Sequence, residues 1–454
     1  MPIQSVNPAT GIVEKVFEEY TQDQVVKTID NSREAFQKWR DTNFLTRRKL
    51  LKNVAQLLTD KKEYFGKILT LEMGKPISQA VSEVEKCAWV CEYFSKNAEQ
   101  LLCKEYISTN ASQSYICFEP LGIILAIMPW NFPFWQVFRF AAPAIMAGNV
   151  CILKHASNVP QCALAIEDIF IKSGFPENVF KTLLIGSDKI QNVIANPDVK
   201  AVTLTGSEIT GSLVARECGL KLKKTVMELG GSDPFIVFED ANIDETVKIA
   251  VKARIINNGQ SCIAAKRFIV VEKIYDEFMN KFTGLMKNVI IGDPMNLNTE
   301  LGPIAREDLL IEIDNQVINS VAKGAEILCG GKRIKRDGYY YAPTILSNLS
   351  KGMPAYDDEI FGPIASLIRV KDENEAIKIA NDTRFGLGAS LWTSDLSKAQ
   401  NIAGKIEAGS VFINEMVKSD PRLPFGGIKN SGYGRELAIY GIKEFVNIKS
   451  IWIK

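Results

Sequence analysis

The feature of this sequence that most constrains its fold is a series of short apolar runs, each followed by a segment with a helical pattern. The runs do not alternate between polar and apolar residues, which indicates strands that are buried on both faces of a parallel sheet. A second series of the same kind begins near Gly230. The first series comprises Gly122–Ile127, Val150–Leu153, Val179–Leu184 and Ala201–Leu204. The sequence therefore predicts an α/β fold with two parallel-sheet domains.

The length of 454 residues is too great for one ordinary domain. We expect residues 1–106 and 119–229 to form the first domain and residues 230–430 the second. Glu105–Glu119 is predicted to be a hairpin, and Phe445–Ile453 is an apolar strand that could add to another sheet. Residues 107–118 and 440–454 are therefore assigned to a separate, small β element.

The composition narrows the class of protein. The chain has 46% hydrophobic residues, 24% charged residues and a net charge of +1, which is ordinary for a soluble enzyme and gives no reason to expect nucleic acid or a membrane as partner. No apolar run is long enough to span a membrane, and Met1–Ser5 is not the start of a signal peptide. The nine cysteines have neither metal-ligand nor disulfide spacing, so we expect free thiols, no metal and a cytoplasmic protein.

Cys262 is the candidate nucleophile. It lies between the helical run Ile243–Ile256 and the strand-like run Arg267–Val271, on a loop that a scaffold can present to a substrate. Gly259 permits a tight backbone there. A thiolate can hold an acyl group as a thioester. A buried structural cysteine is the alternative for this residue alone.

Two further side chains follow strand-like runs and could complete a site. Glu228 ends the run Thr225–Met227 and could act as a general base if burial raises its pKa; the alternative is a solvated glutamate. Asn131, in Met128–Pro133, could donate to an oxyanion; the alternative is a rigid apolar turn. The carboxyl ends of parallel strands meet at one edge of a sheet, where ligands bind.

Two observations restrict the ways in which the chain could bind a dinucleotide or use a histidine in catalysis. Thr205-Gly206-Ser207 joins a strand to a helix whose free N–H groups could bind a phosphate, but no G-x-G-x-x-G turn occurs in the chain. His155 is the single histidine, so mechanisms that pair histidine with serine or cysteine are nearly excluded. We interpret His155 as a packing or hydrogen-bonding residue.

Seven motifs in order along the chain resemble the NAD(P)-dependent aldehyde dehydrogenase superfamily. The resemblance covers essentially the whole chain. The motifs are Met128–Pro133, Lys154, Thr205–Ser207, Glu228–Gly231, Gly259–Cys262, Glu359–Pro363 and Pro424–Gly427.

The resemblance implies a role for each matching residue. Cys262 matches the nucleophile, Glu228 the base that activates water, and Asn131, with the Cys262 backbone N–H, the oxyanion hole. The two predicted domains would be the cofactor-binding and the catalytic domain, and the small β element would join subunits in a homodimer or homotetramer. The cofactor contacts match Trp130, Lys154, Gly206, Ser207, Leu229, Glu359 and Phe361.

Ser157 and the surroundings of Arg139 indicate more closely which cofactor and which substrate to expect. Many NAD-preferring members carry Glu where this chain has Ser157, so we expect NADP, with NAD use still possible. Lys154–Ser157 and Ser419–Pro424 resemble the succinate-semialdehyde dehydrogenase branch. Arg139 lies two turns after Asn131 and, with Ser419, is the candidate partner for the substrate carboxylate; a surface or inter-helix ion pair is its alternative role. Trp135 is expected in the wall of the substrate tunnel.

Three other functions remain open from the sequence. A broad-specificity aliphatic aldehyde dehydrogenase is the main alternative. A CoA-acylating enzyme is disfavoured by Glu228, and a non-catalytic relative by the presence of both Cys262 and Glu228. Some members of the branch carry a second cysteine two residues after the nucleophile; here that residue is Ala264, so we expect no disulfide switch.

Overall fold

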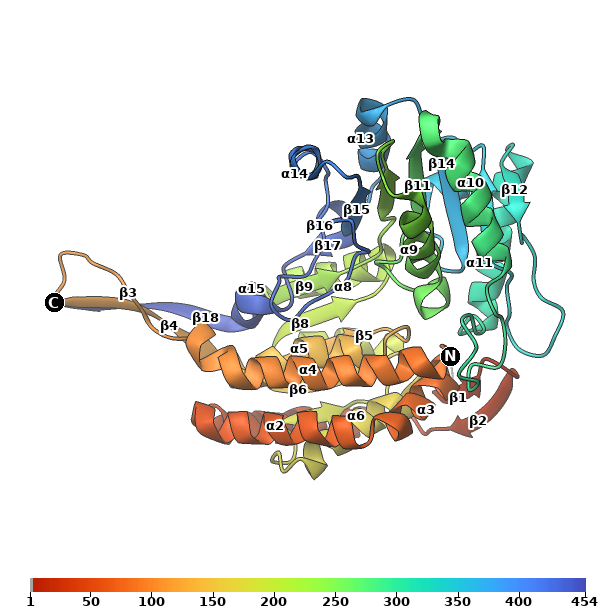
Figure 1. Cartoon of the computed structure of the whole chain (residues 1–454). Coiled ribbons are helices and arrows are strands. Elements are labelled where there is room, and N and C mark those ends of the chain that lie inside the picture. The colour runs from red at the N-terminus through yellow and green to blue at the C-terminus, as the bar shows by residue number, and fades with distance from the viewer. Residues whose placement is uncertain (1–2) are drawn as a thin grey trace.

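The computed structural model describes residues 3–454. Within these residues, a six-stranded sheet forms the centre of the lower unit in Figure 1. Its strand order is β17-β9-β8-β5-β6-β7, and all neighbours are parallel except β17 and β9. The predicted buried strands are confirmed. The strands are β5 (Ile123–Met128), β6 (Val150–His155), β7 (Phe180–Thr182), β8 (Val199–Thr205), β9 (Lys224–Glu228) and β17 (Gly432–Tyr433).

Helices pack on this sheet and on one another. Ser207 caps α8, because its hydroxyl accepts from the Thr210 N–H at 3.3 Å. Helices α2 and α4 pack side by side on the outer layer (Figure 1). The helices of this unit are α1 (Gln22–Trp39), α2 (Phe44–Asp60), α3 (Lys62–Met73), α4 (Ile77–Leu101), α5 (Trp135–Met146), α6 (Pro160–Lys172), η1 (Ser187–Lys189), α7 (Ile190–Ala195) and α8 (Glu208–Leu220).

The upper unit contains a second sheet, with strand order β12-β13-β14-β11-β10-β15-β16. Only β12 runs antiparallel to its neighbour, among the strands of this sheet that the described residues form. The strands are β10 (Pro234–Val237), β11 (Arg267–Val271), β12 (Glu326–Cys329), β13 (Thr344–Ser347), β14 (Ile364–Val370), β15 (Gly388–Trp392) and β16 (Ser410–Ile413). Its helices are α9 (Ile243–Ile255), η2 (Ile256–Gly259), α10 (Glu272–Lys287), α11 (Glu307–Ala322), α12 (Pro354–Asp357), α13 (Glu373–Asn381) and α14 (Leu396–Ala403).

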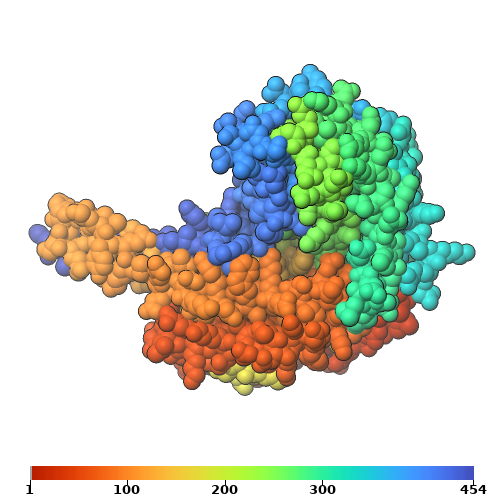
Figure 2. Space-filling view, in the orientation of Figure 1, coloured from red at the N-terminus to blue at the C-terminus, as the bar shows by residue number. Residues whose placement is uncertain are grey.

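A narrow β arm projects from the body of the molecule (Figures 1 and 2). The predicted hairpin and terminal strand are both present and form one sheet of order β18-β4-β3. The strands are β3 (Glu105–Tyr106), β4 (Gln113–Pro120) and β18 (Val446–Ile453), and β18 pairs with β4 along its full length. A separate antiparallel pair, β1 (Gln4–Asn7) and β2 (Ile12–Val16), precedes α1 and was not anticipated.

The last part of the chain returns from the upper unit to complete the lower one. Strand β17 pairs with β9, and η3 (Lys429–Ser431) and α15 (Ala438–Lys443) flank it. The side chains of Phe425, Leu437 and Phe445 are buried in the same core cluster as those of β5 and β6. The core of the lower unit is therefore built from both ends of the sequence. Over residues 3–454, no helix is long and apolar enough to cross a bilayer.

Candidate active site

The loop that carries Cys262 has an unusual backbone. Three consecutive residues, Asn257, Asn258 and Gly259, have φ angles of 57°, 59° and 75°. Asparagine tolerates this left-handed region better than most residues, and glycine has no penalty there. A Cβ on Gly259 would lie 2.3 Å from the carbonyl group of Gly362. The loop therefore makes a close backbone contact with the Glu359–Pro363 motif.

Lys266 holds the nucleophile loop in place. Its Nζ donates to the carbonyl oxygens of Ser261 at 3.0 Å, Cys262 at 2.8 Å and Ala264 at 3.2 Å. It also lies 3.4 Å from Oε1 of Glu359, which accepts from the Gly231 N–H at 3.0 Å. One buried ammonium group thus connects the nucleophile loop to Glu359. The sequence analysis missed Lys266, although a lysine at the start of a buried strand is a signal that could have identified it.

Asn131 is buried directly beside this loop. Its Nδ2 donates to the carbonyl oxygen of Gln260 at 3.0 Å, and its Oδ1 accepts from Nε2 of Gln136 at 3.0 Å. Its own carbonyl oxygen accepts from Nδ2 of Asn257 at 2.8 Å. An amide nitrogen carries two hydrogens, so one N–H of Asn131 remains to donate elsewhere. The structure therefore brings the predicted oxyanion donor and the nucleophile loop together.

A buried ion pair beneath Asn131 fixes the start of α5. Lys75 pairs with Glu83, and Nζ of Lys75 also donates to the Asn131 carbonyl oxygen at 2.9 Å. Oε1 of Glu83 accepts from the backbone N–H groups of Phe134 and Trp135, both at 2.9 Å. A carboxylate at this position satisfies donors that the helix itself cannot. No pattern along the chain marks this pair, because both residues lie in a segment without chemical motifs.

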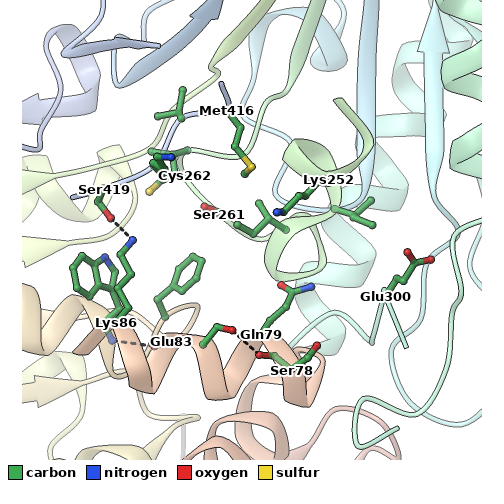
Figure 3. Close-up of a pocket in the computed structure, with 18 of the residues that line it drawn as sticks. Ser78, Gln79, Glu83, Lys86, Lys252, Ser261, Cys262, Glu300, Met416 and Ser419 are labelled. Atoms are coloured by element: carbon green, nitrogen blue, oxygen red, sulfur yellow. Dashed lines mark hydrogen bonds between the residues drawn. The ribbon is translucent and has the colours of Figure 1, made fainter. Parts of the chain in front are cut away.

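Cys262 lines a cavity of about 690 Å³ between the two units. The predicted substrate residues Trp135, Arg139 and Ser419 line the same cavity. Figure 3 shows Cys262 and Ser419 near each other, with Lys86 reaching toward them from α4. The cavity wall is contributed by α4, α5, α9 and the loops around Asn298 and Val417. The structure thus assembles the predicted nucleophile and the predicted substrate residues around one space.

Two effects act in opposite directions on the pKa of the Cys262 thiol. Burial raises the pKa of the thiol to about 12, while the positive charges of Lys266 and Arg139 act in the opposite direction. The resting group is therefore a thiol at neutral pH. The two cations favour the thiolate once a base has removed its proton.

Glu228 lies at the end of β9 and is 2% exposed. Burial, followed by the nearby Glu436, raises the pKa of its carboxyl group well above the usual range, and Arg139 lowers it. Its two oxygens make no hydrogen bond to any described residue. A Cβ on Gly426 would lie 2.7 Å from its Oε1, so a glycine there leaves room for the carboxyl group. Among the described residues that line the cavity, Glu228 is absent, although Arg139 and Phe425 are present.

Arg139 has a partner that the sequence did not reveal. It forms an ion pair with Glu436, and both side chains are only 3% exposed. Its Nη2 lies 3.4 Å from Oγ1 of Thr205, and its guanidinium group lies 4.5 Å from the ring centroid of Phe425. An ion pair, which the sequence left open as the alternative role of Arg139, is thus present, but it is buried and joins α5 to the loop before α15 and not to another helix. Arg139 also lines the cavity.

Other predicted residues gather at the carboxyl ends of the first sheet. Lys154 ends β6 and is 9% exposed, and no carboxylate of the described chain lies within 4.0 Å of its Nζ. Ser157 and the Gly206–Ser207 turn follow β6 and β8. The rings of Trp130 and Phe361 meet edge to face with centroids 5.8 Å apart. None of these residues is among those that line the substrate cavity.

Residues 3–454 contain no group of three or more His, Cys, Asp or Glu side chains placed to hold a metal. His155 accepts from the Ala156 N–H through Nδ1 at 2.9 Å, so its Nε2 donates to the Pro133 carbonyl oxygen at 2.8 Å. Burial lowers the pKa of His155 to about 4. The structure confirms that this residue serves hydrogen bonding and packing.

A family model described as "Aldehyde dehydrogenase family" matches residues 1–451. The chain belongs to the aldehyde dehydrogenase family. A protein of Synechocystis sp. named probable succinate-semialdehyde dehydrogenase (NADP(+)) is 51% identical over 453 residues, which is 100% of both chains. The protein named succinate-semialdehyde dehydrogenase (NADP(+)) 1 of Mycobacterium tuberculosis is 49% identical over 456 residues, again 100% of both.

Solved structures agree with this membership. The crystal structure of succinic semialdehyde dehydrogenase from Streptococcus pyogenes, in complex with NADP+, matches with a TM-score of 0.98 and 38% identity, and the match covers 99% of each chain. The α/β architecture expected from the sequence is therefore that of an aldehyde dehydrogenase, an NAD(P)-dependent oxidoreductase.

The residues that sequence reasoning missed share one property in this aldehyde dehydrogenase. Lys86, Lys266 and Glu436 are charged side chains that lie outside the recognised motifs or at their edges. Lys86 contacts Ser419, Lys266 contacts Glu359 and Glu436 contacts Arg139, and each of these contacts is created by the fold. Their positions therefore follow from the structure and not from spacing along the chain.

Proposed function

We propose that this aldehyde dehydrogenase oxidises succinate semialdehyde to succinate with NADP+. The observation that carries the proposal is the cavity in which the Cys262 thiol, the hydroxyl of Ser419 and two cationic side chains, Lys86 and Arg139, lie together. Cationic and hydroxyl donors suit a substrate that has an aldehyde at one end and a carboxylate at the other. The names of the relatives at about half identity support the same substrate and cofactor.

In the proposed reaction, the Cys262 thiol releases its proton to solvent, its sulfur attacks the aldehyde carbon, and the carbonyl oxygen becomes the oxyanion of a thiohemiacetal. The remaining N–H of the Asn131 amide and the backbone N–H of Cys262 would donate to the oxyanion. Because Asn131 is bonded to Gln260 and Gln136, its amide is held in a fixed orientation and needs little rearrangement. Loss of a hydride then converts the thiohemiacetal to a thioester.

Glu228 would take a proton from the water that hydrolyses the thioester. A carboxyl group whose pKa is raised by burial is a stronger base once it has lost its proton. Succinate would leave and the Cys262 thiol would be restored. Overall, the aldehyde, one water and NADP+ give the acid, NADPH and one proton.

The residues at the carboxyl ends of the first sheet fit a dinucleotide. Bound NADP+ would supply the hydride acceptor. Lys154 is a buried cation without a carboxylate partner among the described residues, which suits ribose and phosphate oxygens. Gly206 and the N-terminus of α8 at Ser207 suit the pyrophosphate, and Leu229 lies beside them. Glu359, Trp130 and Phe361 would contact the nicotinamide half, and Ser157 the adenosine ribose.

The domain roles and the assembly belong to the same proposal. The first sheet would carry the cofactor and the second the catalytic cysteine, with boundaries near residues 229 and 430. We propose that the β arm joins subunits into a homodimer or homotetramer, because its strands expose Tyr106, Ile448 and Trp452. All nine cysteines are free within the described chain, which suits a reducing compartment such as the cytoplasm.

The decisive experiment compares kcat/KM for succinate semialdehyde and butanal with NADP+. Butanal has the same chain length but no carboxylate. We expect a preference of roughly 100-fold or more for succinate semialdehyde, since the carboxylate gains charge-assisted hydrogen bonds. Cys262→Ala is expected to abolish oxidation of both aldehydes while NADP+ binding persists. Equal rates for the two aldehydes would instead indicate a broad-specificity aliphatic aldehyde dehydrogenase.

A further inference from the structure

Lys86 occupies a central place in the substrate cavity. It extends from α4 into the space in front of Cys262, where its Nζ donates to Oγ of Ser419 at 2.8 Å (Figure 3). The ammonium group also lies 4.3 Å from the ring centroid of Trp135. Ser419 itself is buried. The hydroxyl and the indole thus fix the position of the ammonium group without neutralising its charge.

The carboxylates closest to Lys86 are committed to other cations. Glu83, one turn earlier on α4, pairs with Lys75. Asp420, which follows Ser419, accepts from Nε of Arg422 at 2.9 Å and from its Nη2 at 2.6 Å. No carboxylate within the described residues lies within 4.0 Å of Nζ of Lys86. Lys86 is therefore a cation in the cavity that lacks an acidic partner.

Arg139 differs from Lys86 in this respect. Its guanidinium group is already paired with the buried carboxylate of Glu436. A second carboxylate beside Arg139 would also approach Glu436, and like charges repel in a site with little water. Lys86 therefore offers an anionic substrate a positive charge that no carboxylate of the described residues already neutralises.

The electrostatic surroundings of Lys86 also favour an anionic ligand. Burial and, after it, the positive charge of Arg139 lower the pKa of Lys86 to about 8. Keeping Lys86 charged in this buried site therefore costs free energy, and a bound anion would reduce that cost. Apolar side chains, among them Phe132, Trp135 and Phe425, line the same cavity and suit the methylene groups of a short substrate.

We propose that the Lys86 ammonium group, held by Ser419 and Trp135, binds the distal carboxylate of the substrate. Arg139, which lines the same cavity, adds a second positive charge beside it. The inference rests on the proposed function and refines it. It assigns substrate recognition to a residue of α4, outside every motif of the sequence.

The experiment measures kcat/KM for succinate semialdehyde and for butanal in the wild type, Lys86→Met and Lys86→Arg. We expect Lys86→Met to reduce the preference for succinate semialdehyde by roughly 100-fold, mainly through KM, because methionine keeps the apolar stem but removes the charge. Lys86→Arg is expected to restore a large part of the preference. A preference that persists in Lys86→Met would overturn the assignment.

Lys252 provides a matched control for charge. It lines the outer part of the same cavity and is exposed (Figure 3). Lys252→Met removes the same charge, so a direct contact by Lys86 predicts a much smaller loss of preference in this variant. Equal losses in the two variants would mean that the cavity attracts anions through its overall charge, and would contradict a specific role for Lys86.

A pH profile gives a readout that a purely structural role would not change. The charged or titratable groups around Lys86 are Glu83 and Cys87 on α4, Arg139 on α5 and Asp420 on the following loop. Burial raises the pKa of Cys87 well above its usual value, and Arg422 lowers the pKa of Asp420, so neither titrates near pH 8. The ratio of kcat/KM for the two aldehydes should fall as pH rises through about 8, because Lys86 loses its charge there.

The outcomes separate this inference from the proposed function. A wild type without preference for succinate semialdehyde defeats both. A wild-type preference that Lys86→Met retains, with a ratio that is flat across pH 8, defeats only the role of Lys86. If Lys86→Met is not stably folded, Ser419→Ala and the wild-type pH profile test the same contact, and a ratio unaffected by both contradicts it.

Discussion

At the scale of single residues, the proposed contact of Ser157 with the adenosine ribose would determine whether a 2′-phosphate is accepted. Ser157 lies two residues after the end of β6 and three after the buried cation Lys154. A neutral hydroxyl leaves the positive charge of Lys154 available to a phosphate, whereas a carboxylate would repel that phosphate.

We therefore expect Ser157→Glu to shift the ratio of kcat/KM for NADP+ over NAD+ toward NAD+ by about tenfold or more. Ser157→Ala is the control, because it removes the hydroxyl without adding charge and should change the ratio less. An unchanged ratio in Ser157→Glu would show that this side chain does not face the adenosine ribose.

Arg139 shows why some site residues could be located from the sequence but not fully interpreted. Its spacing from Asn131 predicted a place in the cavity, and the structure has it there. Its partner Glu436 is nearly 300 residues away in sequence, and no local pattern marks it. Removing one member of a buried pair costs about 3–5 kcal/mol, because it leaves the other charge unpaired. Arg139→Ala would therefore mix a loss of stability with any loss of substrate binding.

At the scale of elements, the left-handed run before Cys262 is the most constrained segment. A methyl group at position 259 would meet both an unfavourable φ of 75° and the backbone of Gly362 at 2.3 Å. Relief of this clash must move either the nucleophile loop or the Glu359–Pro363 segment.

We expect Gly259→Ala to lower the free energy of unfolding by about 1–3 kcal/mol and to slow alkylation of Cys262 by iodoacetamide. The Cys262 peptide is followed by mass spectrometry, because the chain has nine cysteines. Gly219→Ala on α8 is the control, since a Cβ there would have no neighbour within 4 Å. A normal alkylation rate in Gly259→Ala would show that the loop tolerates a side chain at this point.

The strands differ in how strongly their own sequence predicts them. Strands β5, β6 and β8 contain short runs of mainly apolar residues, and the pattern of these runs along the chain predicts them. Strands β1, β2, β13 and β17 were not predicted. They have at most five residues, and β2 is exposed throughout. Such strands form because a partner strand is present, so the sequence around them contains little information about them.

At the scale of the whole molecule, the β arm exposes apolar side chains on strands that lie outside the body. Ile448 and Trp452 are 58% and 57% exposed and point to the same face of β18, because they are four residues apart. Exposed apolar groups on a projecting sheet are costly for a monomer in water.

We expect the protein to be a dimer or tetramer by light scattering, and expect Ile448→Asp combined with Trp452→Asp to release monomers. Leu45→Asp, at an exposed apolar position on α2, is the control and should keep the wild-type mass. A wild type that is monomeric with its arm intact would contradict the proposed assembly.

The route by which the chain returns to its first sheet has a consequence for biosynthesis. The ribosome completes β5 to β9 when only half of the protein exists, yet Phe425, Leu437 and Phe445 of their core and the counter-ion of Arg139 are made near the end. Until then the nascent lower unit has an incomplete core and an unpaired buried arginine. The core of the lower unit can therefore be completed only during the last tenth of translation. A chain that is truncated shortly before this point would lack these residues, and its lower unit would not be stable.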